Sequence, residues 1–457
     1  MSEPARQAST ARPAHAEQVP LWMQLQGAAA LLIAVRAGRS MTAELERLAP
    51  HLRPGVQALG FHALRWLGLA EALRQQLVSR EPPPQADALL CVALALAAQV
   101  DESLYSAYTL VDQTVEAAKQ SEETRHQASF INGCLRRFLR ESQTMLALCE
   151  RKPQAVWNHP QWWIDGVRKD HPQAWQAILQ ANNSRAPLCL RVNQRQISRP
   201  NYLLALQGAG IDAAPVGEQG VLLATACPVT RLPGYSQGHF SVQDAGAQLA
   251  ANLLLTGLTG LTAPAGQPLQ LLDACAAPGG KTAHLLELAD ARVLALDIDA
   301  QRCERIAHNL ERLQLQAQLV VADAGQPAGW WDGRMLDGIL LDAPCTASGI
   351  VRRHPDVRWL RRPGDIAQLA AQQKRLLEAL WPLLRPGGRL LYCTCSIFNA
   401  EGQGQIETFL MRHTEALLLP SPGHLLPQSG MVGPVFPDNL LREYDGFYYA
   451  LLEKQPL

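Results

Sequence analysis

Hydrophobic residues recur at three- and four-residue steps through the first third of the chain, for example at Leu69, Leu73 and Leu77. This spacing places the apolar side chains on one face of a helix. Prolines interrupt the pattern only briefly, as at residues 82–84, where they mark helix ends. We therefore predict an all-α bundle over residues 19–150. Residues 1–18, which are rich in Pro, Ala, Ser, Gln and Arg, are predicted to form a disordered tail.

Beyond the predicted bundle the hydrophobic pattern changes twice. Over residues 151–240, tryptophans cluster and short strand-like segments alternate with Asn, Pro and Gly, which predicts a small mixed α/β connector module. Over residues 241–457, strand-like runs that end at Asp273, Asp297 and Asp342 alternate with helical segments. That alternation predicts a mostly parallel, doubly wound Rossmann-like sheet with ligands at the carboxyl ends of its strands. The chain is thus predicted to be multidomain.

Composition narrows the class of protein more than the class of partner. The 457 residues carry 41 Lys and Arg against 41 Asp and Glu, so the net charge indicates no partner. The longest hydrophobic runs fall short of the ~20 residues that span a bilayer, and the first residues lack the pattern of a signal peptide. Ten cysteines are scattered without the spacing of a secreted disulfide scaffold. We therefore expect a cytoplasmic protein with no membrane segment and with reduced cysteines.

The segment from Asp273 to Thr282 (DACAAPGGKT) lies between a predicted strand and a predicted helix. Adjacent glycines let a backbone approach a ligand closely, and a helix N-terminus offers free N–H donors. Asp297 follows at the end of the next strand, where doubly wound folds place an acid that binds ribose hydroxyls. A P-loop would need glycine in place of Cys275, and the dinucleotide pattern G-x-G-x-x-G is absent. A loop for a nucleoside methyl donor and a purely structural glycine turn remain.

Two cysteines follow the ends of two further predicted strands: Cys345 in Asp-Ala-Pro-Cys and Cys395 in Cys-Thr-Cys-Ser. Because both ends face the crevice of the glycine loop, two thiols and Asp342 should converge there. Carbon 5 of cytosine is too weak a nucleophile to take a methyl group directly, but a thiolate added at carbon 6 turns the ring into an enamine. A nearby cation such as Lys281 would favour the thiolate. Asp342 could hydrogen-bond the Watson–Crick edge of the base.

Other interpretations of these cysteines stay open. Either thiol alone is more often an inert core residue, as we expect for Cys393. A metal site formed by Cys345, Cys393 and Cys395 has no matching second pair or histidine cluster, so no metal is expected. From spacing alone, either Cys345 or Cys395 could be the nucleophile.

In combination, residues 275–281, the segment from Asp342 to Cys345 and the Thr-Cys-Ser segment around Cys395 resemble the motifs of the Sun-type family of RNA cytosine-5 methyltransferases. Nearly the whole chain is similar to bacterial members of that family that act on 16S ribosomal RNA. The resemblance implies a class I methyltransferase domain over residues 241–457, with S-adenosylmethionine as the methyl donor.

By that resemblance, Cys395 is the nucleophile and Cys345 assists release of the methylated base, with Asp342 at the reaction centre. Lys281 joins this catalytic group through its charge. DNA cytosine methyltransferases use the Pro-Cys cysteine instead, so only the resemblance decides between the two thiols. The residues implied in donor binding are Cys275, Ala276, Ala277, Pro278, Gly279, Gly280, Lys281, Asp297, Asp323 and Asp342. One departure from the family is the Asn-Ala-Glu-Gly segment at residues 399–402, where relatives usually carry Pro-Glu-Glu-Asn.

RNA contacts are predicted at two basic clusters, although such clusters also form ordinary solvated faces. The residues are Arg352, Arg353, Arg358, Arg361 and Arg362 after the Asp342 strand, and Arg136 and Arg137 in the helical region. Cations suit phosphates, and the intervening Trp359 could stack on a base of single-stranded RNA. The target cytosine must be unpaired or flipped out, because a paired base does not expose carbon 6 to a thiol.

The helical region bears on the choice of RNA. Residues 111–119 and 130–137 resemble an RNA-binding NusB-like domain, which favours ribosomal RNA over tRNA as the partner. An RNA-binding assembly factor with an inactive methyltransferase fold is the alternative of a different class. The intact cysteine motifs and the Gly279-Gly280 pair argue against that alternative.

Overall fold

The computed structural model describes residues 19–99, 105–258, 267–427 and 444–456. The chain divides into two compact units, Met1–Val156 and Trp157–Leu457, each of which is described by itself. The tail predicted over residues 1–18 lies outside the described residues.

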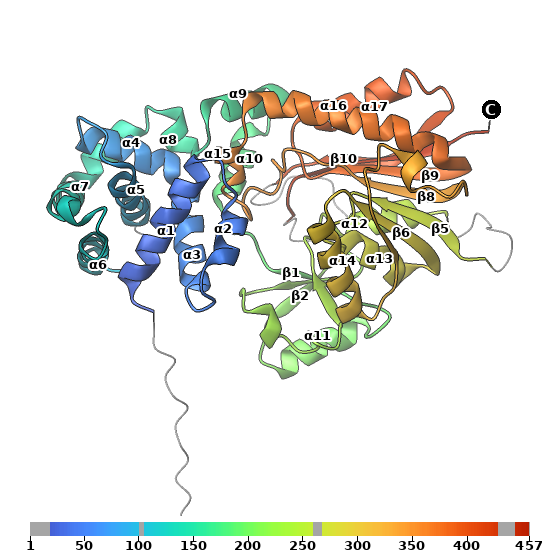
Figure 1. Ribbon diagram of the computed structural model, residues 1–457, viewed down its shortest axis with the longest axis horizontal. Coiled ribbons are helices and arrows are strands. Elements are labelled where there is room, and N and C mark those ends of the chain that lie inside the picture. The colour runs from blue at the N-terminus through green and yellow to red at the C-terminus, as the bar shows by residue number, and fades with distance from the viewer. Residues whose placement is uncertain (1–18, 100–104, 259–266, 428–443, 457) are drawn as a thin grey trace, which may run out of the picture. The chain divides into compact units, whose positions relative to one another are not determined.

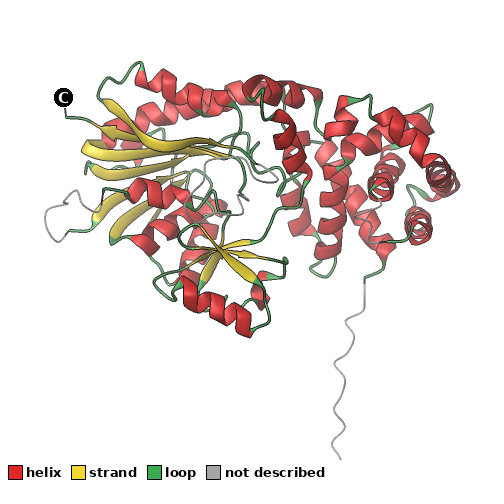
Figure 2. Cartoon of the chain, turned by 180° about the vertical axis from the view of Figure 1, so that it is seen from behind, coloured by secondary structure: helices red, strands yellow, loops and turns green. Residues whose placement is uncertain are grey.

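The described part of the first unit is helical, as the spacing of its hydrophobic residues predicts (Figure 2). Its helices are α1 (Leu21–Arg36), α2 (Met41–Arg47), α3 (Arg53–Arg65), α4 (Leu67–Leu77), α5 (Pro84–Ala98), α6 (Ala107–Lys119) and α7 (Ala128–Cys149), and α8 (Pro153–Trp157) follows at the boundary. Helix α5 is buried on every side from Ala86 to Leu96, so it forms the centre of the bundle. Likeness to a NusB domain stays a prediction.

The second unit begins with two short helices and a small sheet. The helices are α9 (Gln161–Asp170) and α10 (Trp175–Asn183). The sheet has the order β2-β3-β1-β4 and antiparallel pairing, from β1 (Cys189–Val192), β2 (Ala213–Val216), β3 (Gly220–Leu223) and β4 (Phe240–Val242). Helix α11 (Arg199–Gly208) packs on it through Tyr202 and Leu206. This arrangement agrees with the mixed α/β module predicted from the sequence.

The main sheet of the second unit has seven strands in the order β10-β11-β9-β8-β5-β6-β7. The strands are β5 (Leu269–Ala274), β6 (Ala291–Asp297), β7 (Gln318–Val321), β8 (Leu336–Asp342), β9 (Leu384–Thr394), β10 (Ala416–Leu425) and β11 (Phe447–Lys454). Strands β5 to β9 pair in parallel, which confirms the predicted doubly wound sheet. Strand β11 runs antiparallel between β9 and β10, an addition that the hydrophobic pattern did not reveal.

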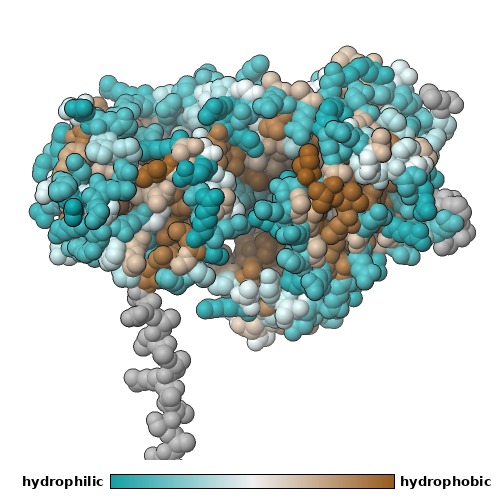
Figure 3. All heavy atoms as spheres, in the orientation of Figure 1, coloured by the Kyte–Doolittle hydropathy of each residue, from teal (hydrophilic) through white to brown (hydrophobic). Residues whose placement is uncertain are grey.

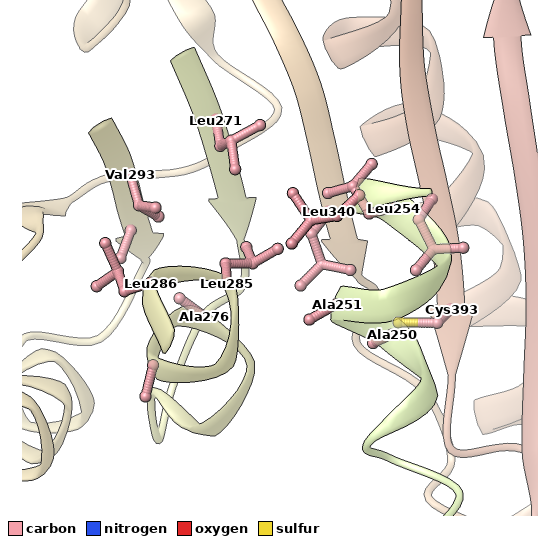
Figure 4. Close-up of a cluster of buried hydrophobic side chains, with 14 of the residues drawn as sticks. Ala250, Ala251, Leu254, Leu271, Ala276, Leu285, Leu286, Val293, Leu340 and Cys393 are labelled. Carbon is pink, nitrogen blue, oxygen red and sulfur yellow. The ribbon is translucent and has the colours of Figure 1, made fainter. Parts of the chain in front are cut away.

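Helices cover both faces of this sheet (Figure 1). One face carries α12 (Leu249–Leu255), α13 (Gly280–Leu288) and α14 (Ala300–Leu313), and the other carries α16 (Pro363–Leu380) and α17 (Gln403–Leu410). Neighbouring strand residues such as Leu271 and Leu272 enter opposite cores, since side chains alternate along a strand. In Figure 4, Leu254 lies near Leu340 and Ala250 near Cys393, so α12 covers the centre of the sheet.

No helix among the described residues is long and apolar enough to cross a bilayer. On the face drawn in Figure 3, hydrophilic side chains predominate on each unit, and hydrophobic ones form scattered patches.

Candidate active site

The glycine loop leaves the end of β5 and enters helix α13. Cys275 and Gly279 take left-handed backbone conformations, with φ of 62° and 93°. A Cβ on Gly279 would lie 2.9 Å from Cγ2 of Ile306, so only glycine fits at the start of this helix. The amide of Ala276 donates to the carbonyl of Leu296 at 2.9 Å, which ties the loop to the end of β6. The loop is therefore a turn that is fixed to β6 by a hydrogen bond and ends at the N-terminus of α13.

Two acids follow the ends of the neighbouring strands. The carboxylate of Asp297, the last residue of β6, is 1% exposed and accepts the amides of Ala277 and Asp299, each at 3.2 Å. Asp323 follows β7, and Arg375 donates to its two oxygens at 3.0 and 3.1 Å. Those hydrogen bonds from Arg375 lower the pKa of Asp323. Asp323 thus carries its charge, and both acids lie at the edge of the sheet where the loop lies.

Lys281 and Asp342 form an ion pair in this crevice. The Nζ of Lys281, in the first turn of α13, lies 2.7 Å from Oδ2 of Asp342, the last residue of β8. Burial by itself would lower the pKa of Lys281, but the charge of Asp342 and the neighbouring Cys393 and Cys395 raise it above its ordinary value. The thiol of Cys393 donates to the other oxygen of Asp342 at 3.5 Å. The ammonium is therefore held charged beside the cysteines.

The two cysteines singled out from the sequence meet beside this ion pair. Cys345 Sγ lies 3.4 Å from Cys395 Sγ, and both side chains are half-buried. The hydrogen bond with Cys395, followed by burial, raises the pKa of Cys345 well above its ordinary value. Cys345 is thus held as the protonated thiol of the pair. Burial likewise raises the pKa of Cys275, to about 12, so that thiol stays protonated.

Among the described residues, no group of His, Cys, Asp and Glu could hold a metal ion. The glycine loop, its acids, the ion pair and the two thiols predicted from the sequence all lie at the carboxyl ends of the parallel strands. The register of the strands accounts for this, because Ala274 pairs with Leu296 and Leu341, and Asp342 pairs with Cys393.

The arginines that follow β8 do not form one basic face. Arg358 is completely buried and donates to Asn158 O, Asn182 O and Asn183 Oδ1. Arg352 is 3% exposed and pairs with Asp445. Their guanidinium groups are enclosed by the protein, so the prediction that these two residues contact RNA is wrong.

The remaining arginines of that cluster differ in exposure. Arg353 is partly exposed and pairs with Asp244 at 2.8 Å and with Asp445 at 2.5 Å. Arg361 donates to the carbonyls of Thr346 and Cys345, at 2.9 and 3.2 Å, and so braces the Cys345 turn. Arg362 is exposed. In the first unit, Arg136 and Arg137 are exposed on α7, where they donate to Asn132 and Glu141.

Two buried residues contribute to the site without having been singled out from the sequence. Arg191 of β1 binds both oxygens of Glu287 at 2.7 and 2.8 Å and also donates to the carbonyl of Gly280. Glu401, in the short helix Asn399–Glu401, accepts hydrogen bonds from both cysteine turns. In the sequence, only the position of Glu401 shortly after Cys395 indicates that it could contribute to the site. Nothing in the local sequence around Arg191 indicates its partner on α13.

The chain matches family models over most of the second unit. Residues 262–453 match the family described as 16S rRNA methyltransferase RsmB/F. Residues 159–230 match the ferredoxin-like domain described for RsmF/B-like methyltransferases. This second match covers the small antiparallel sheet up to its third strand, together with the two helices before it.

Curated relatives and solved structures extend the match to nearly the whole chain. Ribosomal RNA small subunit methyltransferase B of Vibrio cholerae serotype O1 is 39% identical over 440 residues, covering 94% of this chain and 96% of the relative. The protein of that name from Pseudomonas putida is 41% identical over 442 residues, covering 93% and 97%. The structure titled Crystal Structure of PH0851 has a TM-score of 0.72 at 25% identity, covering 94% of this chain and 99% of its own.

A methyltransferase homolog protein from Pyrococcus horikoshii has a TM-score of 0.54 at 27% identity, covering 66% of this chain and 97% of its own. The resemblance inferred from the motifs is thereby confirmed. The chain belongs to the ribosomal RNA small subunit methyltransferase B family.

Proposed function

We propose that the protein transfers a methyl group from S-adenosylmethionine to carbon 5 of a cytosine in 16S ribosomal RNA, with Cys395 as the covalent nucleophile. The names of the relatives and of the family model support ribosomal RNA methylation. The observation that carries the proposed mechanism is the 3.4 Å contact between Cys345 and Cys395 beside the Lys281–Asp342 ion pair.

The residues present fit S-adenosylmethionine. Asp297 ends β6, where doubly wound folds place the acid that binds ribose hydroxyls, and the missing side chain at Gly279 lets the loop backbone approach the donor. We assign the donor to residues 275–281, with Asp323 on the adenine side and Asp342 near the reaction centre. When bound there, the donor supplies an electrophilic methyl group.

Cys395 activates the base. Its thiolate adds to carbon 6 of the cytosine, and the electron pair of the C5–C6 double bond makes carbon 5 nucleophilic. After methylation, a base accepts the proton of carbon 5, the C5–H electron pair re-forms the double bond, and the C6–S bond breaks with its electrons on sulfur. Lys281 favours the thiolate through its charge. Asp342, partly exposed, is available to hydrogen-bond the Watson–Crick edge.

Cys345 assists release. Because the hydrogen bond with Cys395 and burial raise the pKa of Cys345, its sulfur keeps a proton. At 3.4 Å that S–H can donate to the sulfur of Cys395 as the C6–S bond breaks. The departing thiolate is stabilised, and the methylated RNA is freed.

We propose RNA contacts at exposed Arg362, with Arg353 and Arg361 beside the active site, and at Arg136 and Arg137 of α7. In this proposal residues 19–150 form a NusB-like RNA-binding domain. Residues 151–240 form an RNA-binding connector, and residues 241–457 form the catalytic domain.

The direct test is transfer of tritiated methyl groups to unmethylated 16S ribosomal RNA and, in parallel, to tRNA. Mapping then identifies the modified base. We expect 5-methylcytosine in the ribosomal RNA and none with the Cys395→Ala variant. Labelling of tRNA alone would refute the ribosomal substrate. Equal labelling by the wild type and the variant would refute the nucleophile, and no labelling of either RNA would favour an inactive assembly factor.

A further inference from the structure

We infer that Glu401 is the positioning residue for both thiols: its buried carboxylate holds the Cys345 turn and the Cys395 turn against each other. The inference rests on the proposed function for its meaning, since the spacing of the two sulfurs matters only if both act on one base. Glu401 does not touch the sulfurs, so its action passes through the residues next to them.

On the side of Cys345, the carboxylate binds the following residue twice. The amide of Thr346 donates to Oε1 of Glu401 at 2.9 Å, and the Thr346 hydroxyl donates to Oε2 at 2.5 Å. Gln373 of α16 adds a bridge, since its side-chain amide donates to Oε1 at 3.2 Å and to the carbonyl of Pro344 at 2.9 Å. The residues on both sides of Cys345 are thus tied to one carboxylate.

On the side of Cys395, the same carboxylate binds the next residue along the chain. The hydroxyl of Ser396 donates to Oε2 of Glu401 at 2.6 Å. The backbone carbonyl of Glu401 accepts the hydroxyl of Tyr392 on β9 at 2.7 Å. One oxygen, Oε2, therefore receives a hydroxyl from each cysteine turn, although the turns follow different strands.

The residues of this hydrogen-bond network are completely buried, which distinguishes the network from a chance contact at the surface. Glu401, Thr346, Ser396 and Gln373 are each 0% exposed. A buried carboxylate is costly unless hydrogen bonds satisfy it, and here four donated bonds do so. Burial raises the pKa of Glu401, and those hydrogen bonds oppose the rise. Because four hydrogen bonds hold the shared carboxylate, the two sulfurs should keep their spacing without RNA or methyl donor.

The test compares Glu401→Gln with Glu407→Gln, an exposed residue of α17 that serves as the matched control. The first readout is thiol spacing in the full-length protein, with neither RNA nor methyl donor. Diamide takes one hydrogen from each thiol to become a hydrazine, and the two sulfurs join. Peptide mapping then quantifies the Cys345–Cys395 disulfide.

We expect cross-linking to slow at least fivefold in Glu401→Gln and to stay within twofold of wild type in Glu407→Gln. If Glu401→Gln cross-links at the wild-type rate, the inference is overturned. It is also overturned if the wild-type protein does not cross-link. If Glu401→Gln does not fold, a second pair of variants tests the same contact. Thr346→Val lacks the hydroxyl that donates to Glu401, and Thr346→Ser keeps it. Slow cross-linking in Thr346→Val and recovery in Thr346→Ser support the inference, whereas equal rates overturn it.

The second readout separates positioning from general damage. In Glu401→Gln we expect single-turnover methylation to fall about tenfold or more. Affinity for S-adenosylhomocysteine and the unfolding temperature should stay near wild type. A parallel loss of ligand affinity would mark a merely structural role and overturn the inference. The cross-link forms without any substrate, so the two readouts are independent. If cross-linking slows in Glu401→Gln but no form of the protein, the wild type included, methylates RNA, the result contradicts the proposed function and not the positioning role of Glu401.

Discussion

Cys345 and Cys395 stand 50 residues apart in the chain, yet their sulfur atoms lie 3.4 Å apart. Each follows the carboxyl end of its own strand, and β8 and β9 pair in parallel with Asp342 beside Cys393. The connection between the strands contains α16 on one face of the sheet. This crossover brings both turns to the edge that the glycine loop also reaches, so two thiols can act on a single base.

Replacing Cys395 by alanine should abolish methylation, because it removes the thiolate that adds to carbon 6 in the proposed mechanism. Binding of S-adenosylhomocysteine should change less than twofold, since the loop of residues 275–281 is untouched. Titration calorimetry measures the binding, and tritium transfer measures the activity. The Cys227→Ala variant, altered beside the small sheet, should retain activity. A Cys395→Ala enzyme that still methylates would remove this residue as the nucleophile.

Replacing Cys345 by alanine should trap the covalent intermediate. Without the neighbouring S–H, the departing thiolate loses its hydrogen bond, so breakage of the C6–S bond slows more than its formation. We expect a protein–RNA adduct that survives a denaturing gel and is absent from the Cys345→Ala/Cys395→Ala double variant. If the single variant forms no more adduct than wild type, Cys345 has no part in release.

Replacing Arg191 by methionine should destabilise the second unit by about 3 to 5 kcal/mol, because it leaves Glu287 buried without its partner. The double variant Arg191→Met/Glu287→Leu should recover part of that loss. Scanning calorimetry checks both. Donor affinity should fall as well, since Arg191 also holds the carbonyl of Gly280. Full stability in the single variant would show that the pair contributes little.

Asp273 predicts a pH dependence of stability. It is completely buried, and burial raises its pKa from 3.8 to about 7. Between about pH 4 and pH 7 the folded protein keeps this proton while the unfolded chain releases it. Each pH unit in that window therefore removes up to about 1.4 kcal/mol of stability.

The variant Asp273→Asn should not show this loss. The difference in unfolding temperature, Asn variant minus wild type, should rise as pH rises from 4 to 7 and level off above. Calorimetry over a pH series measures it. A difference that is constant across the series would contradict the raised pKa of Asp273.

Arg362 and Arg358 should respond differently to alanine substitution. Arg362→Ala removes an exposed charge, so RNA affinity should fall several-fold and its dependence on salt should weaken by about one ion. Arg358→Ala empties a buried site and should lower the unfolding temperature. Filter binding over a salt series, combined with calorimetry, distinguishes the two. An unchanged salt dependence in Arg362→Ala would remove Arg362 from the RNA face.

Much of the candidate site could be predicted because its signals are local. The glycine loop, the acids that end β6 and β8, and both cysteines each stand at the end of a strand or in the turn that follows it, where the hydrophobic run stops. The alternation of strands and helices then places such strand ends at one edge of the sheet. The antiparallel strand β11 was not predicted, because no single segment of the sequence determines the order of the strands in a sheet.

The sequence by itself determined which chemical groups reach the crevice, because hydrophobic period and turn residues act over a few neighbours. Only the tertiary structure decided their contacts: the 3.4 Å between the sulfurs, the carboxylate of Glu401 shared by both turns, and the enclosure of Arg358. An arginine has the same charge in a local sequence whether it faces solvent or the protein interior. Packing between distant segments makes that difference, and spacing along the chain does not record it.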